Sequence, residues 1–187
     1  MTRAADSKIS GSLSGTELQQ TLLGIWAVNE RMNQMLLEGL DARAWRAKAP
    51  ENARTIAAIF THVHNIRRKW VRLSAPHLKL PAELDRSRTT LPQARKALAE
   101  SAARCAEMIE EGLRGGGRVK QFKRDGWAKA WPCGAAMVAY MITHEAHHRG
   151  QAAMLAHQMG FRLKGKAAYG IWSWESLWKE CGFSGPA

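Results

Sequence analysis

The sequence predicts an all-α protein, a single domain built as a four-helix bundle. Four stretches repeat apolar residues at the three- and four-residue spacing of an amphipathic helix. Capping residues, prolines or glycines mark the ends of these stretches. With 187 residues, of which 45% are hydrophobic, the chain can bury one proper core. We expect residues 1–14 to form a flexible N-terminal arm and residues 15–187 to form the domain.

The first helix is expected at residues 15–39. Ser14 and Glu17 have the spacing of a capping box, which satisfies backbone N–H groups at a helix start. Gly39, followed by Asp41, supplies the end of the helix. The residues predicted to face inward are Leu18, Leu22, Ile25, Trp26, Asn29, Met32, Leu36 and Leu40.

The second helix is expected at residues 53–74, after a connection over residues 41–52. Pro50 cannot continue a helix, whereas Asn52 can cap the next one. Pro76 closes the helix. Its predicted inward face consists of Ile56, Ile59, Phe60, Val63, Ile66 and Trp70.

The third helix is expected to run from a cap at Thr90 to about Leu113. Residues 75–91 before it are long enough to carry the chain across one end of the bundle. The glycines at 115–117 indicate a turn, and residues 118–131 are expected to form an extended lid. The inward face of this helix is predicted as Leu98, Ala102, Cys105, Met108 and Ile109.

The fourth helix, from Pro132 to about Met159, carries the most informative stretch, His-Glu-Ala-His-His-Arg-Gly-Gln at residues 144–151. At ~100° per residue, His144, His148 and Gln151 share one helix face with Met137 and Leu155, so both imidazoles are expected to point inward. The spacing alone is weak, since seven histidines give roughly 0.3 such pairs by chance. A third histidine from a facing helix would indicate a metal site rather than hydrogen-bonded core histidines.

The second helix offers two candidates for that third ligand, His62 and His64. They lie roughly 90° and 110° to opposite sides of the centre of the apolar face, so periodicity does not choose between them. The alternative interpretation makes both of them partly solvated residues at the helix flank.

Charge and composition argue against a nucleic-acid-binding protein, a membrane protein and a cysteine-based metal or disulfide site. The net charge of +12 attracts polyanions, but the basic residues are dispersed and accompany no helix-turn-helix or zinc-finger pattern, so specific nucleic-acid binding is not expected. No apolar run approaches the ~20 residues of a membrane span, and a cytoplasmic protein is expected. Cys105, Cys133 and Cys181 are too widely spaced to indicate a disulfide framework or a thiolate zinc site.

The C-terminal tail, residues 161–187, is rich in aromatic residues. We expect Tyr169, Trp172, Trp174 and Trp178 to hold the tail against the bundle as a hydrophobic latch. No alternating strand pattern supports the other interpretation, a platform for stacking bases.

The pattern of histidines resembles the DinB/YfiT-like family of small metal-binding four-helix bundles. In that family a His of the second helix joins an H-x-x-x-H pair followed by R-G-Q on the last long helix, which His62, His144, His148 and residues 149–151 match. The choice of His62 over His64 comes from the resemblance, because Thr55, His62 and Trp70 fall at the family's spacing. The resemblance covers about residues 15–175.

The resemblance implies a bundle with a long crossover, often a homodimer, and a divalent metal ion held by three imidazoles. The implied ligands are His62, His144 and His148, with His64 and His147 as alternates, and zinc is the expected ion, with nickel or iron as alternatives. Characterised relatives are similar to thiol-dependent transferases and isomerases that use mycothiol, bacillithiol or glutathione. We therefore expect a metal-dependent thiol S-transferase or hydrolase that takes a low-molecular-weight thiol. The alternative is a non-catalytic metal-binding or stress-response bundle, and a third, less expected one is a weak nucleic-acid binder that uses its basic surface.

Three imidazole ligands would leave a metal position open, as in catalytic sites. Gln151, one turn beyond His148, is the candidate for orienting a ligand or a substrate, and a packed polar side chain is its alternative. Glu145 points roughly 100° away from His144, so it is expected on the helix surface rather than as a general base. Arg149 is expected to be solvated.

Overall fold

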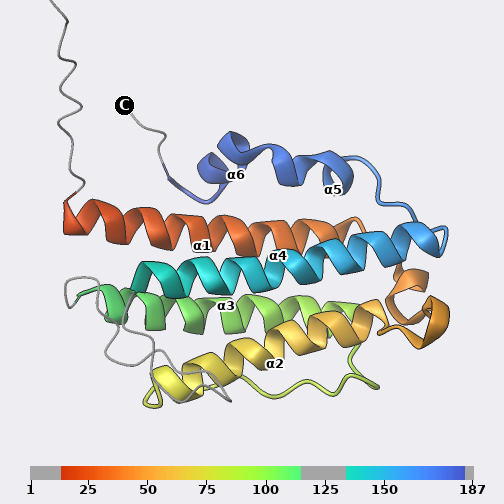
Figure 1. Ribbon diagram of the computed structural model, residues 1–187, viewed down its shortest axis with the longest axis horizontal. Helices are drawn as coiled ribbons and strands as arrows, with labels where there is room; N and C mark the ends of the chain where they lie inside the picture. The colour runs from red at the N-terminus through yellow and green to blue at the C-terminus, as the bar shows by residue number, and fades with distance from the viewer. Residues whose placement is uncertain (1–13, 115–133, 184–187) are drawn as a thin grey trace, which may run out of the picture.

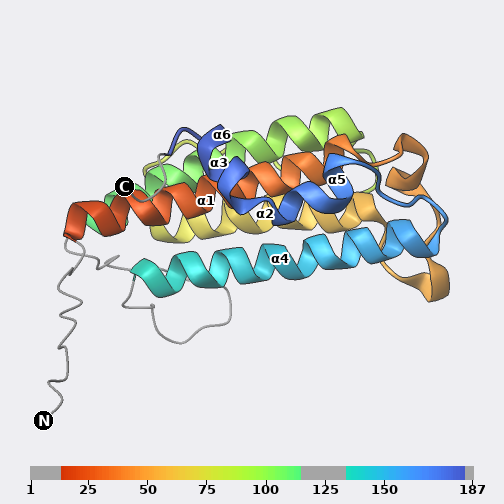
Figure 2. The same ribbon diagram turned by 90° about the horizontal axis from the view of Figure 1, so that it is seen from above.

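The computed structural model is all-helical over the residues that it describes, 14–114 and 134–183, which confirms the predicted fold class. Four long helices lie side by side as a bundle (Figures 1 and 2). In Figure 1, α1 and α4 run in one direction and α2 and α3 run in the other. The bounds of the four helices are α1 Gly15–Glu38, α2 Ile56–Ser74, α3 Leu91–Arg114 and α4 Gly134–Gln158.

Two of the predicted helix starts are confirmed and one was wrong. Ser14 and Glu17 form the capping box, with the Glu17 amide donating to Ser14 Oγ at 3.2 Å and the Ser14 amide donating to Glu17 Oε2 at 2.7 Å. Thr90 Oγ1 caps α3 in the same way. The cap of α2 is Thr55, whose Oγ1 accepts from the Ala58 amide at 3.1 Å, and not Asn52. Asn52 instead belongs to a separate turn, η2 Pro50–Asn52.

The core has an apolar cluster towards each end of the bundle and a buried polar layer between them. One cluster gathers the start of α4, the end of α2 and the second half of α3, with Trp26 and Trp70 as its largest members. The other gathers the start of α2 and the end of α4 around Phe60 and Leu98, and Trp45 from η1 Ala42–Arg46 closes it. The buried polar residues between the two clusters are Asn29, Asn33, His64, Arg67, Glu145, His148 and Arg149.

The segment over residues 75–90 returns along the bundle, because α2 and α3 run in the same direction (Figure 1). Its backbone is held on α2 by side chains of that helix. Asn65 donates to the Leu84 carbonyl at 2.9 Å and accepts from the Leu84 amide at 3.1 Å, and Arg68 donates to the Pro81 carbonyl at 2.8 Å.

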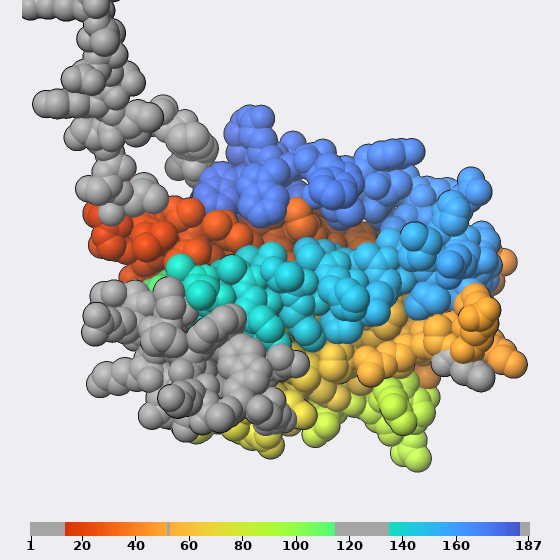
Figure 3. Space-filling view, in the orientation of Figure 1, coloured from red at the N-terminus to blue at the C-terminus, as the bar shows by residue number. Residues whose placement is uncertain are grey.

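The tail packs along α1 as three short pieces, α5 Lys166–Tyr169, η3 Gly170–Trp172 and α6 Trp174–Glu180 (Figure 3). Leu177 and the half-buried Trp178 make the contact, against Val28 and Met35 of α1. The latch is therefore present, but three of its four predicted aromatic residues were wrongly included in it, since Tyr169, Trp172 and Trp174 are 79%, 82% and 44% exposed. The tail also explains why α1 is buried on a second face that its periodicity did not indicate.

Several expectations lie outside the described residues. These are the flexibility of residues 1–13, the turn at 115–117, the lid at 118–131, the helix start at Pro132 and the position of Cys133. Among the helices within residues 14–114 and 134–183, none combines the length and the apolar character needed to cross a membrane.

Candidate metal centre

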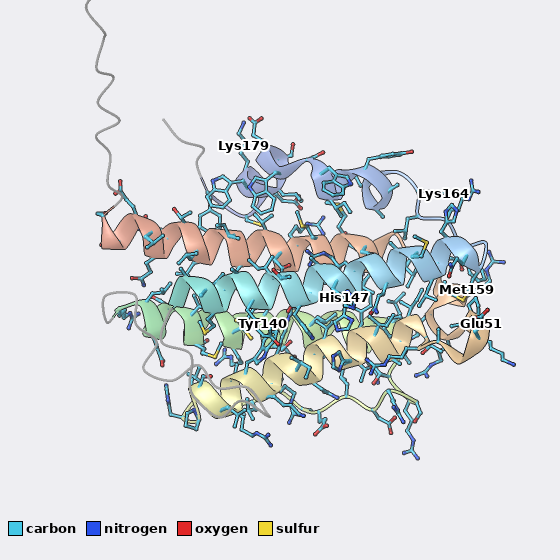
Figure 4. All side chains as sticks on the ribbon, viewed as in Figure 1. Glu51, Tyr140, His147, Met159, Lys164 and Lys179 are labelled. Atoms are coloured by element: carbon cyan, nitrogen blue, oxygen red, sulfur yellow. The ribbon has the colours of Figure 1, made fainter. Side chains whose placement is uncertain are left out.

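The structure brings together one histidine of α2 and two of α4. The candidate ligand nitrogens of His62, His144 and His148 all lie within 4.8 Å of one another. The ring centroids are 4.6 Å apart for His144 and His148, 4.8 Å for His62 and His148, and 5.5 Å for His62 and His144. The cluster therefore joins α2 to α4, and His148 is also one of the buried polar residues of the core. Figure 4 labels Tyr140 and His147, which precede and follow His144 on α4.

The spacing of the two α4 histidines suits a shared cation. Their Nε2 atoms are 3.2 Å apart. Zinc–nitrogen bonds of 2.0–2.1 Å at a tetrahedral angle separate two ligand nitrogens by about 3.3 Å. The set of donors therefore fits a divalent metal ion that binds imidazole.

Gln151 fixes the tautomer of His148. Gln151 Oε1 lies 2.8 Å from His148 Nδ1, and an amide oxygen can only accept a hydrogen bond. His148 Nδ1 therefore carries the proton and donates, which leaves the lone pair on Nε2, the atom that faces His144. Orientation of a ligand by a hydrogen bond at its other ring nitrogen is a common feature of metal sites.

Burial keeps two of the three imidazoles uncharged. Desolvation, helped by repulsion from a proton on His148 and from the charges of Arg54 and Lys69, lowers the pKa of His62 from its ordinary value of 6.5 to about 4. Desolvation also lowers the pKa of His148, although its hydrogen bond to Gln151 acts in the opposite direction. Both imidazoles are neutral at pH 7, which is the form that binds metal ions.

An aromatic wall and a pocket border the cluster. The His144 ring meets Trp70 edge-on at 5.4 Å between centroids and lies 6.4 Å from the ring of Tyr140. A pocket of about 160 Å³ is lined by these three residues together with His62, Ile66, Lys69 and Leu73. A second cavity, of about 520 Å³, reaches His62 from the side of residues 83–86.

The two alternate histidines lie elsewhere. His64 is fully buried rather than at a solvated flank of α2. Its Nδ1 is 2.9 Å from the Ala97 carbonyl of α3, and its Nε2 is 2.8 Å from the Ala82 carbonyl. His147 is exposed, with its ring 5.2 Å from that of His148. Neither belongs to the group whose nitrogens converge.

The positions predicted for Glu145 and Arg149 were wrong. Glu145 is 0% exposed and Arg149 is 9% exposed, although both were expected at the surface. The centre of the buried face of α4 runs through these two residues, and the histidines lie to one side of it. The sequence contains a signal for this, because Met141, Glu145, Arg149, Ala152 and Ala156 continue one stripe at helical spacing.

Glu145 is bound by an arginine of the facing helix. Arg67 donates to both of its carboxylate oxygens, from Nε to Oε1 and from Nη2 to Oε2, each at 2.6 Å. Burial alone would raise the pKa of Glu145, but the guanidinium of Arg67 and the hydrogen bonds from Asn33 and Asn29 together hold the pKa below its ordinary value. Likewise, burial would lower the pKa of Arg67, but Glu145 and Glu30 raise it. Both groups are therefore charged.

Comparison with known proteins supports the same assignment as the histidine pattern. A search of curated proteins found no match to this chain. The model of the DinB family matches residues 13–173, which include all four long helices and the three clustered histidines. The chain therefore belongs to the DinB family.

Proposed function

We propose that this DinB protein binds a divalent metal ion through His62, His144 and His148 and uses it in the transfer of a low-molecular-weight thiol. The observation that carries the proposal is the convergence of three imidazoles from two helices, beside a pocket lined by two of them. A site with three protein ligands keeps a position for a substrate, whereas structural zinc sites have four. Zinc is the ion that we expect, with nickel and iron as alternatives.

The ion would supply Lewis acidity at neutral pH and favour the thiolate form of a bound thiol. The protein residues have separate tasks. Gln151 holds the proton on His148 Nδ1, so that Nε2 stays available as a ligand. Trp70 and Tyr140 line the pocket beside His144 and would give a bound substrate an apolar wall. Lys69 at the same pocket favours a thiol that carries a carboxylate.

Glu145 is not available as a general base at the cluster. It is the carboxylate next to His144 in the sequence. Both of its oxygens accept from Arg67, and it is fully buried. A bound thiol or water would instead lose its proton to solvent, because the ion would lower its pKa.

Metal analysis of the purified protein tests the site. We expect about one ion per chain, lost in the variants His62→Ala, His144→Ala and His148→Ala. The variant His147→Ala is the matched control, because this exposed neighbour should leave the metal content unchanged. Folded wild-type protein that takes up no zinc, nickel or iron would overturn the proposal.

A panel of thiols then tests the reaction. Each of mycothiol, bacillithiol and glutathione would be supplied with an electrophile, and the loss of free thiol would be measured with and without the metal ion. We expect metal-dependent consumption with one of them, and the variant Gln151→Leu should reduce both the activity and the metal affinity. Molar mass measured in solution would test the homodimer that we also propose.

The alternative is a metal-binding bundle without catalytic activity. The position of the cluster, which joins α2 to α4, favours it, since an ion there would tie the two helices together. This alternative predicts a large drop in melting temperature on chelation and no thiol consumption with any member of the panel.

A further inference from the structure

A connected set of buried polar side chains joins α1, α2 and α4 in the middle of the bundle. We call it the arginine–glutamate network. Two arginines and two glutamates give it no net charge, and two asparagines link them. Its members are Asn29, Glu30, Asn33, Arg67, Glu145 and Arg149.

Arg67 is the centre of the network on α2. Besides its two bonds to Glu145, it donates from Nη1 to the Leu98 carbonyl of α3 at 2.8 Å. The same Nη1 lies 2.7 Å from Glu30 Oε2 of α1. Its side chain is fully buried, so four helices meet at one guanidinium.

Glu145 is the centre of the network on α4. Its Oε2 accepts from Asn29 Nδ2 at 2.6 Å and from Asn33 Nδ2 at 2.8 Å. The amide oxygens of the same two asparagines accept from Arg149 Nη1, at 2.6 Å and 3.0 Å. Glu145 is thereby fixed against α1 as well as against α2, and Arg149 is fixed against α1.

Residues of the network lie next to, or close to, the clustered histidines in the sequence. Glu145 follows His144 directly, and Arg149 follows His148. Arg67 lies five residues after His62 on α2. Any sliding or rotation of α4 against α2 that broke the pair of Arg67 and Glu145 would therefore also move His144 and His148 relative to His62.

A bidentate ion pair is suited to fixing such a register. Apolar helix faces tolerate small displacements, whereas an arginine fork and a carboxylate bind well in few geometries. A buried pair also contributes little net stability compared with apolar side chains of similar volume, and control of register is its best-attested role. Metal ligands, in turn, must be placed within a few tenths of an ångström.

We propose that Arg67 and Glu145 are positioning residues for the three histidines: they set the register of α4 against α2 and thereby determine the affinity and the geometry of the metal site. This inference rests on the proposed metal binding. It adds that the geometry of the three histidines depends on Arg67 and Glu145, which are not themselves members of the cluster.

The test compares metal binding with stability in matched variants. Arg67→Lys keeps the positive charge but cannot donate two parallel hydrogen bonds to Glu145. The double variant Arg67→Met with Glu145→Met removes the ion pair, and the opposite charges of Glu30 and Arg149 keep the remaining network neutral. Leu177→Ala is the control, since it weakens the buried contact of the tail and leaves the network intact. Zinc affinity is measured by competition with a chelator, geometry by the visible absorption of bound Co²⁺, and stability by thermal unfolding.

We expect Arg67→Lys and the double variant to bind zinc at least about 10-fold more weakly and to show a changed Co²⁺ spectrum. Leu177→Ala should lower the melting temperature without either effect. Unchanged zinc affinity and Co²⁺ spectrum in Arg67→Lys would overturn the inference while leaving the proposed function standing, even if the double variant did not fold. Wild-type protein that binds no zinc and no Co²⁺ would overturn both.

Discussion

Replacing Arg67 by methionine should be among the most destabilising single changes in this protein. The side chain is fully buried and binds both oxygens of Glu145 at 2.6 Å. Methionine fills much of the space but leaves the carboxylate, itself 0% exposed, without its counter-charge. Breaking a buried pair in this way costs about 3–5 kcal/mol. This is a large share of the roughly 5–15 kcal/mol that holds a typical domain folded.

Urea unfolding of the metal-free protein at pH 7, followed by circular dichroism, measures this loss. The matched control is Arg68→Met, one residue further along α2. Arg68 pairs with Glu83 at 3.1 Å, but the Glu83 side chain is 70% exposed, and Arg68 also donates to the Pro81 carbonyl. Loss of both contacts should cost less than about 2 kcal/mol, well below the loss expected for Arg67→Met.

The pH dependence separates a lost ion pair from a simple packing defect. In the wild-type protein the pKa of Glu145 is held below its ordinary value of 4.5, so its contribution to stability is present above pH 4.5 and is lost as the pH falls. Without Arg67, burial should raise that pKa, and protonation then relieves the buried charge. The deficit of Arg67→Met should therefore be largest at pH 7 and shrink towards pH 4. A deficit below about 1 kcal/mol at pH 7, or one that is equal at both pH values, would refute this reasoning.

Three further predictions follow from other contacts. The variant His64→Ala should lose about 2–4 kcal/mol of stability, because it leaves a cavity and removes a buried ring that lies within hydrogen-bond distance of three oxygens. It should keep its full metal content, and loss of the metal would make this histidine a ligand after all. The metal-free protein should lose thermal stability as the pH falls from 6.5 to about 4, since protonation of His62 favours the unfolded state, and the variant His62→Gln should show a shallower slope. The variant Gly24→Ala would place a Cβ 2.6 Å from the Trp178 ring, so it should loosen the tail and speed its proteolysis. The control Gly150→Ala has open space around its Cβ and should raise the free energy of unfolding by up to about 1 kcal/mol. Equal rates of proteolysis in the two variants would contradict the packing argument.

Features that depend on neighbouring residues in the chain could be predicted before the fold was known. The capping box of Ser14 and Glu17 and the cap at Thr90 are local hydrogen bonds, so residue spacing was enough to predict where α1 and α3 begin. The inward face of α3 followed from its period, and all of its predicted members, Leu98, Ala102, Cys105, Met108 and Ile109, are buried. The same reasoning found the histidine pair of α4, although the role of the pair as a ligand remains a prediction.

What each flank of a helix faces depends on how the other helices pack around it, which the sequence pattern does not show. His62 and His64 are nearly symmetric about the apolar centre of α2, and only the placement of the neighbouring elements separates them. The flank with His62 faces α4, while the flank with His64 faces α3 and the Ala82 carbonyl. Periodicity carries no information about which neighbour lies on which side.

The burial of Glu145 was likewise beyond local reasoning. A glutamate in a helix is usually solvated, because leaving a charge in the core without a partner is too costly. Its partner, Arg67, lies 78 residues away in the chain and on another helix. Only folding brings the two charges together, and the middle layer of the bundle is polar because each of them makes burial of the other tolerable.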